Sequence, residues 1–183
     1  SITINCPTPT TALTVTPNPV CNYATPVTLG GGTPTGGTYS GTGVSAGTFD
    51  PSVGTQTITY TVTDIYGCVS SDDDVLTVNT PPTVNLGGPY TQCGGTVTLD
   101  AGNAGSTYAW SDGTTTTQTL TATTSNTYSV TVTDANTCSA SAQASVTINT
   151  VPTVTIAGTT ELCSGATGNL TATSAATNFV WST

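Results

Sequence analysis

The stretch 128-YSVTVTDANTC-138 decides the fold, because apolar and polar residues alternate along it before an Asp and a Cys. Nearly the same stretch, 58-ITYTVTDIYGC-68, lies 70 positions earlier. A period of two residues predicts a β-strand with one buried face. An Asp among small residues predicts the turn that ends such a strand, because its carboxylate bonds nearby backbone N–H groups. The chain therefore repeats one strand-and-turn element.

Other landmarks recur at the same spacing. Cys21, Cys93 and Cys163 lie 72 and 70 positions apart, and the linkers 79-NTPPTV-84 and 149-NTVPTV-154 lie 70 apart. Such agreement predicts tandem units of about 70 residues. The expected boundaries are 1–6 for a linker or the end of a preceding unit, 7–80 for the first unit, 81–150 for the second, and 151–183 for the N-terminal part of an incomplete third unit. We therefore expect the 183 residues to be a window of a longer chain.

Alternating runs in the second unit predict six strands. Their expected ranges are 83–86, 96–101, 106–112, 117–123, 127–134 and 141–149. No stretch has a helical period, and short strands separated by Gly, Asn, Asp and Pro are typical of a sandwich. We therefore expect an all-β fold of tandem immunoglobulin-like β-sandwich repeats. The expected core residues include Tyr39, Trp110, Tyr128, Val132 and Trp181.

The charge excludes several classes of function. The chain has no Lys, Arg, His or Met, and its acidic residues give a net charge of -9. Nucleic-acid binding needs Lys and Arg against the phosphates, and an anionic membrane surface would repel the chain. Catalysis that depends on a His or Lys side chain is excluded because the chain contains neither residue. We expect no enzyme activity, no catalytic residue, no cofactor, no nucleic-acid partner and no membrane insertion.

Six cysteines in a β-rich chain indicate an oxidising, extracellular setting. The sequence leaves two alternative sets of disulfide pairings. Topology favours Cys21–Cys138 between units with Cys6–Cys68, because the cysteines of one unit are expected at opposite ends of its sandwich. The alternative is Cys21–Cys68 and Cys93–Cys138 within units. Bonds between units would turn the array into a stiff rod.

Acidic and aromatic residues offer weaker candidate sites. Asp72, Asp73 and Asp74 are candidate calcium ligands because hard oxygen ligands cluster in calcium loops, and the competing interpretation is a solvated strand edge. The loop residues Tyr23, Tyr66 and Tyr90 are expected either to stack on a ligand or to pack the ends and junctions of the units.

The pattern C-x-G, VTL, Y-x-W-S-x-G and TYSVTVTDANTC, which starts at Cys93, resembles the immunoglobulin-like and PKD-like repeats of very large Bacteroidota surface adhesins. These include gliding-motility adhesins and other proteins exported by the type 9 secretion system. The resemblance implies an extracellular, cell-surface array that mediates adhesion or spans distance. It supplies no catalytic residue.

Three functions are compatible with these observations. The first is a structural, non-catalytic stalk segment of a repetitive surface adhesin, whose partners are neighbouring repeats of the same chain. The second is a subunit of a self-assembling extracellular filament, whose partners are other copies. The third is a carbohydrate-binding module of a secreted protein with a surface or glycan ligand.

Overall fold

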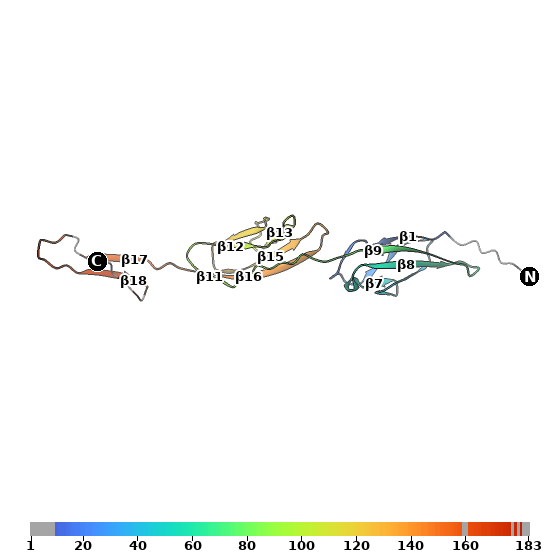
Figure 1. Cartoon of the computed structure of the whole chain (residues 1–183), viewed down its shortest axis with the longest axis horizontal. Coiled ribbons are helices and arrows are strands. Elements are labelled where there is room, and N and C mark those ends of the chain that lie inside the picture. Colours follow the sequence, from blue (N-terminus) through green and yellow to red (C-terminus); the bar gives the residue numbers. More distant parts are fainter. Residues whose placement is uncertain (1–9, 159–160, 177, 179, 181–183) are drawn as a thin grey trace, which may run out of the picture.

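The computed structural model describes residues 10–158, 161–176, 178 and 180. Figure 1 shows their strands in three groups along one long axis: β1 to β10, β11 to β16, and β17 with β18. Apart from a short 3-10 helix at Pro51–Val53, the regular structure of the described residues is β-strand. The chain is therefore all-β, which confirms the prediction from the alternating pattern. Among those residues no helix has the length and apolar character needed to cross a membrane.

The first group contains ten strands. They are β1 (Ala12–Thr16), β2 (Val20–Cys21), β3 (Val27–Thr28), β4 (Gly30–Thr33), β5 (Thr38–Ser40), β6 (Val44–Ser45), β7 (Thr48–Phe49), β8 (Gln56–Thr63), β9 (Val69–Leu76) and β10 (Val78–Asn79). They form the sheets β1-β4, β10-β2, β3-β7-β6 and β5-β8-β9. All these pairs are antiparallel except β10 with β2, which are parallel. The parallel pair places Cys21 opposite Asn79.

The core of the first group lies between these sheets. Its buried side chains are Leu13, Val15, Leu29, Phe49, Ile58, Tyr60, Val62 and Leu76. The Tyr60 ring lies against the backbone of Gly32 and Gly37, where any Cβ atom would overlap it. The Tyr60 hydroxyl accepts a hydrogen bond from Gly37 N at 2.7 Å and donates one to Pro34 O at 2.7 Å. The tyrosine that packs on them therefore requires glycine at positions 32 and 37.

The second group has six strands in two facing sheets. They are β11 (Tyr90–Cys93), β12 (Val97–Asp100), β13 (Thr107–Trp110), β14 (Thr119–Ala122), β15 (Asn126–Thr133) and β16 (Ser139–Asn149). One sheet has the order β11-β16-β15-β13 and the other pairs β12 with β14. The core between them contains Trp110, Tyr128 and Val132 with ten other buried residues, all from this group. Trp110 Nε1 donates to Thr117 O at 2.9 Å, so the buried indole is hydrogen-bonded.

Two details of the predicted second unit are wrong. Residues 83–86 do not form a strand, although Leu86 is buried in the core. Side chains bond this stretch instead of a neighbouring strand, because Thr83 O accepts from Asn103 Nδ2 at 2.9 Å and Asn85 Oδ1 accepts from Gly87 N at 2.9 Å in a turn. The unpredicted strand is β11, which pairs in parallel with β16 and places Cys93 opposite Asn149.

The third group is one antiparallel pair, β17 (Val154–Gly158) with β18 (Leu170–Ser174). Its apolar side chains Val154, Ile156 and Leu170 are all more than half exposed. This pair therefore has no core of its own within the described residues. The predicted core residue Trp181 lies outside them.

Candidate functional site at the junction of the two cores

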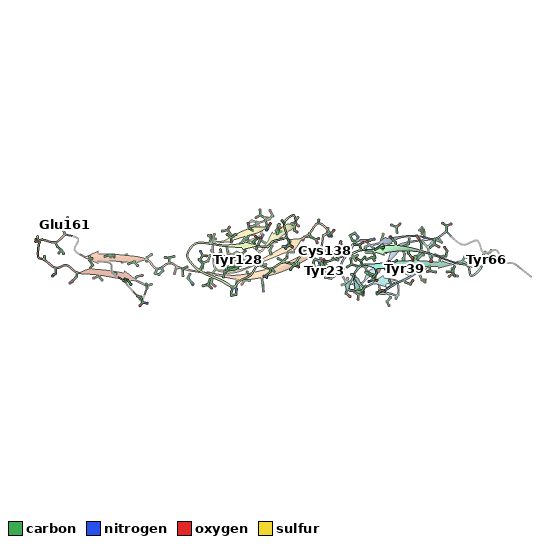
Figure 2. The ribbon with its side chains drawn as sticks, in the orientation of Figure 1. Tyr23, Tyr39, Tyr66, Tyr128, Cys138 and Glu161 are labelled. Carbon is green, nitrogen blue, oxygen red and sulfur yellow. A yellow bond between two sulfur atoms is a disulfide. The ribbon has the colours of Figure 1, made fainter. Side chains whose placement is uncertain are left out.

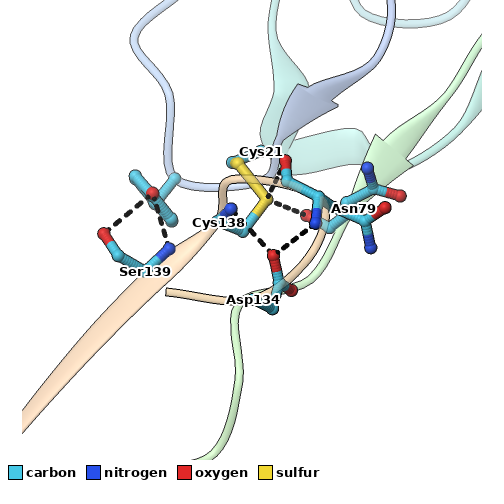
Figure 3. Close-up of a disulfide and its surroundings, with 7 residues drawn as sticks. Cys21, Asn79, Asp134, Cys138 and Ser139 are labelled. Atoms are coloured by element: carbon cyan, nitrogen blue, oxygen red, sulfur yellow. Dashed lines mark hydrogen bonds between the residues drawn. A yellow bond between two sulfur atoms is a disulfide. The ribbon is translucent and has the colours of Figure 1, made fainter. Parts of the chain in front are cut away.

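A disulfide joins the first and second groups of strands. Cys21, the last residue of β2, is bonded to Cys138, which precedes β16, with 5.7 Å between their Cα atoms (Figure 3). The Cys138 side chain is fully buried. We call this bond the junction disulfide. It is the between-unit pairing that topology favours.

Strand register explains why Cys138 does not pair with Cys93, the other cysteine of the second group. Cys93 lies opposite Asn149 at one end of β16, whereas Cys138 precedes the other end of this 11-residue strand. Eleven strand residues span about 35 Å, while a disulfide requires Cα atoms within about 7 Å. Register therefore excludes Cys93–Cys138, and the bond between Cys21 and Cys138 excludes Cys21–Cys68, so the within-unit alternative is wrong.

An Asp turn presents Cys138 to its partner. The Asp134 carboxylate accepts hydrogen bonds from Asn136 N and Cys138 N, each at 2.9 Å. Asp134 N also donates to Cys138 O at 2.9 Å, which closes the turn. The first group repeats this geometry, because the Asp64 carboxylate accepts from Tyr66 N and Cys68 N at 2.8 Å. The repeated Asp therefore holds the backbone of the turn that ends in Cys.

A tyrosine and a carbonyl complete the contact between the cores. The Tyr23 hydroxyl accepts a hydrogen bond from Ser139 N at 3.0 Å and lies 3.3 Å from Ser139 Oγ. These bonds, chiefly that with the serine side chain, lower the pKa of Tyr23 because they stabilise the phenolate. Cys138 Sγ lies 3.9 Å from Asn79 O, which is a packing contact because a disulfide sulfur carries no proton. The sequence contains no repeated signal for Tyr23, since Gly95 stands at the matching position after Cys93.

The remaining cysteines differ in their environment. Cys93 and Cys163 are free and exposed. The predicted Cys6–Cys68 bond involves Cys6, which lies outside the described residues. Cys68 itself is almost completely buried.

The three consecutive acids do not form one ligand set. They lie on β9, where successive side chains point to opposite faces. Asp72 and Asp74 are half-buried and accept hydrogen bonds from Leu13 N and Val15 N of β1, each at 2.8 Å, whereas Asp73 is exposed. Both sequence-based interpretations, a calcium loop and a solvated edge, missed this use of two carboxylates as partners for strand β1. Within residues 10–158, 161–176, 178 and 180, no three His, Cys, Asp or Glu side chains gather as metal ligands.

The three loop tyrosines occupy different places. Tyr23 lies at the junction, and Tyr66 is exposed at the opposite end of the first group (Figure 2). The half-buried Tyr90 donates its hydroxyl proton to Leu86 O at 2.7 Å. Tyr39, a predicted core residue, is half-buried with its ring centroid 4.8 Å from that of Tyr60. The three loop tyrosines therefore form no common surface.

Comparisons with known proteins identify no family. No protein-family model matches the chain, and no curated protein matches it. Among solved structures it is similar to SGBP-B of the mixed-linkage glucan utilization locus of Bacteroides ovatus, solved in complex with a mixed-linkage heptasaccharide. The two are 17% identical, and the match covers 71% of this chain and 42% of the other with a TM-score of 0.25. At that TM-score the similarity carries no argument about architecture or ligand.

Proposed function

We propose that this chain is a structural, non-catalytic stalk segment of an extracellular, repetitive surface adhesin. Its units are tandem immunoglobulin-like sandwiches, and its partners are the neighbouring units. The junction disulfide carries this proposal, because it ties the end of one core to the end of the next. A covalent bond there opposes bending at the linker, which a segment that holds a binding site away from a surface requires.

Composition supports the same function. Disulfides persist in oxidising compartments outside the cytosol. A net charge of -9 with no cation keeps neighbouring molecules apart in solution. A role in gliding motility rests on the sequence resemblance alone and stays a prediction.

Small-angle X-ray scattering of the full chain tests the stalk proposal. The oxidised protein is expected to scatter as one extended body with a fixed angle between its two cores. Cys21→Ser is expected to shorten the mean end-to-end distance and to require an ensemble of bent shapes. A matched control, Cys93→Ser with Cys163→Ser, changes two exposed free cysteines and should leave the profile unchanged. Equal bending in the oxidised chain and in Cys21→Ser would contradict the proposal.

Exposed apolar side chains on β17 and β18 favour a second candidate, the filament subunit. Val154, Ile156 and Leu170 are more than half exposed, and a strand from a neighbouring chain would bury them. Sedimentation velocity over a range of concentrations tests this function. A filament subunit is expected to form head-to-tail oligomers that Ile156→Ser abolishes, whereas a stalk segment sediments as a monomer.

A carbohydrate-binding module has weaker support. A shallow hollow of about 320 Å³ lies over β15 and β16 and is lined by Ser129, Ser141, Ala142 and Gln143. Its lining contains no aromatic ring on which a sugar could stack. The exposed Tyr23 and Tyr66 lie at opposite ends of the first group (Figure 2).

A further inference from the structure

The geometry around Cys21 occurs a second time, around Cys93. Cys21 lies opposite Asn79 in the parallel pair β2 and β10, and Cys93 lies opposite Asn149 in the parallel pair β11 and β16. The next residue donates its N–H to the same asparagine carbonyl in both places. Asn22 N lies 3.0 Å from Asn79 O, and Gly94 N lies 2.8 Å from Asn149 O. Both cysteines therefore have the same strand pairing, and the same hydrogen bond follows each of them.

The two cysteines differ in whether they form a disulfide. Cys21 is bonded to the Asp134–Cys138 turn of the next group, whereas Cys93 is free and exposed. The linker that follows Asn149 passes beside Cys93, because the Val151 side chain lies against Gly94. A unit that follows this linker is thus delivered to the Cys93 end, as the second group is delivered to Cys21.

We infer that Cys93, Gly94 and Asn149 form a second junction site, and that its partner is an Asp-x-x-x-Cys turn on a further unit of the same kind. The inference rests on the proposed function and extends it, because it states that a disulfide joins each pair of consecutive units in the array. The structure defines the partner chemically. The turn must place an Asp carboxylate on its own backbone N–H groups, as Asp134 does, so that its cysteine sulfur projects toward Cys93.

The bond forms by thiol–disulfide exchange. The Cys93 thiolate attacks the turn cysteine held as a mixed disulfide with a small thiol such as glutathione. One sulfur–sulfur bond forms, another breaks, and the small thiol leaves as its thiolate, so that no further oxidant is consumed. The second site lacks an equivalent of Tyr23, because Gly95 stands there. The disulfide at Cys93 therefore holds the next unit without the tyrosine contact seen at the first junction.

A chain with one duplicated unit tests the inference. A copy of residues 84–153 is inserted after Thr153, which brings a second Asp134–Cys138 turn next to the second junction site through the native linker. A companion chain carries a copy of residues 81–150 after Thr150, so that its new linker reproduces the Pro81–Pro82 sequence of the first junction. Both are refolded with reduced and oxidised glutathione. Disulfides are then mapped by mass spectrometry after cleavage at acidic and aromatic residues.

The expected product contains Cys21–Cys138 and, in addition, Cys93 bonded to the copied Cys138. Alkylation of Cys93 in the native state should fall about tenfold or more relative to the original chain, since a disulfide sulfur does not react as a thiolate. The copied Cys93 should then be free and exposed in place of Cys93, while Cys163 stays free. In a control with Cys93→Ser, the copied Cys138 should instead be recovered as a thiol after unfolding.

Three results would overturn the inference. If Cys21–Cys138 forms while Cys93 stays reactive in both duplicated chains, the second junction site is not a disulfide site, and the proposed stalk function survives. If neither duplicated chain forms Cys21–Cys138 but the original chain does, the junction does not accept added units, and the inference fails. If the original chain itself lacks Cys21–Cys138, the inference fails together with the proposed function.

Discussion

Loss of the junction disulfide should destabilise the second core by an amount that depends on the pairing of Cys21 with Asn79. Cys21 is held opposite Asn79 while the first core is folded. The bond therefore fixes Cys138 beside Asn79, and the loop that it closes in the unfolded second group is the 59 positions between them rather than the 117 from Cys21. Closing a loop of this length restricts the unfolded chain by about 4 kcal/mol in the chain-entropy model.

The best substitution is Cys21→Ala, because it leaves Cys138 as a thiol that still fills its buried position. The background carries Cys93→Ser and Cys163→Ser to prevent reshuffling, and Trp181→Phe so that fluorescence reports on Trp110. The free energy of unfolding of the second core should fall by about 4 kcal/mol. For a group of about 70 residues, this lowers its melting temperature by about 15–30 °C.

Thermal and urea unfolding followed by Trp110 fluorescence measure this change, with the background chain as the control. Mass spectrometry first establishes that the background chain contains Cys21–Cys138. A shift below about 4 °C would correspond to less than about 1 kcal/mol and would refute the reasoning. The two cores would then be independent, or the unfolded second group would already be compact.

Three further predictions concern the aspartates. Asp134→Ala removes the acceptor of two turn N–H groups and should lower the free energy of unfolding of the second core by about 1–3 kcal/mol, measured by urea unfolding. Asp134→Asn keeps an acceptor and should cost less, and equal losses in the two variants would contradict the turn role. Asp72→Ala and Asp74→Ala should each destabilise the first core by about 1.5–3 kcal/mol, because each leaves an N–H of β1 without its charged partner. The exposed Asp73→Ala is their control and should stay within about 0.5 kcal/mol. The Asp112 carboxyl should titrate with a pKa of about 2 rather than 3.8, chiefly because it accepts hydrogen bonds from Thr115. Its folded pKa is lowered, so its stabilising contribution is present above pH 3.8 and lost as pH falls toward about 2; carbon-detected NMR that gives a pKa near 3.8 would contradict this.

Local patterns were sufficient to predict the long strands. Residues 127–134 and 141–149 were expected as strands, and β15 and β16 occupy Asn126–Thr133 and Ser139–Asn149. Their alternation is a property of the strand itself, since one face packs on the core. The short strand β11 escaped prediction because its pairing with β16, more than 50 positions later, is not recorded in its own four residues.

The site was less predictable than the fold. The sequence reduced the possible cysteine pairings to two sets. The choice between these sets depends on which end of β16 lies opposite Cys93, and the register of β11 with β16 decides that. The acids at 72–74 show the same limit. Their alternating roles follow from lying on β9 beside β1, and a run of three identical residues carries no sign of which side faces the core.

The junction disulfide also decides where mechanical load travels when the chain is pulled from its two ends. Tension that enters before Cys21 passes through the sulfur–sulfur bond to Cys138 and leaves along β16, so the 117 positions of chain enclosed by the bond bear little of it. That enclosed length, about 400 Å if fully extended, cannot be drawn out while the bond is intact. Most of the first core is thus shielded from force, and reduction of one bond would convert a nearly inextensible segment into one that lengthens under load.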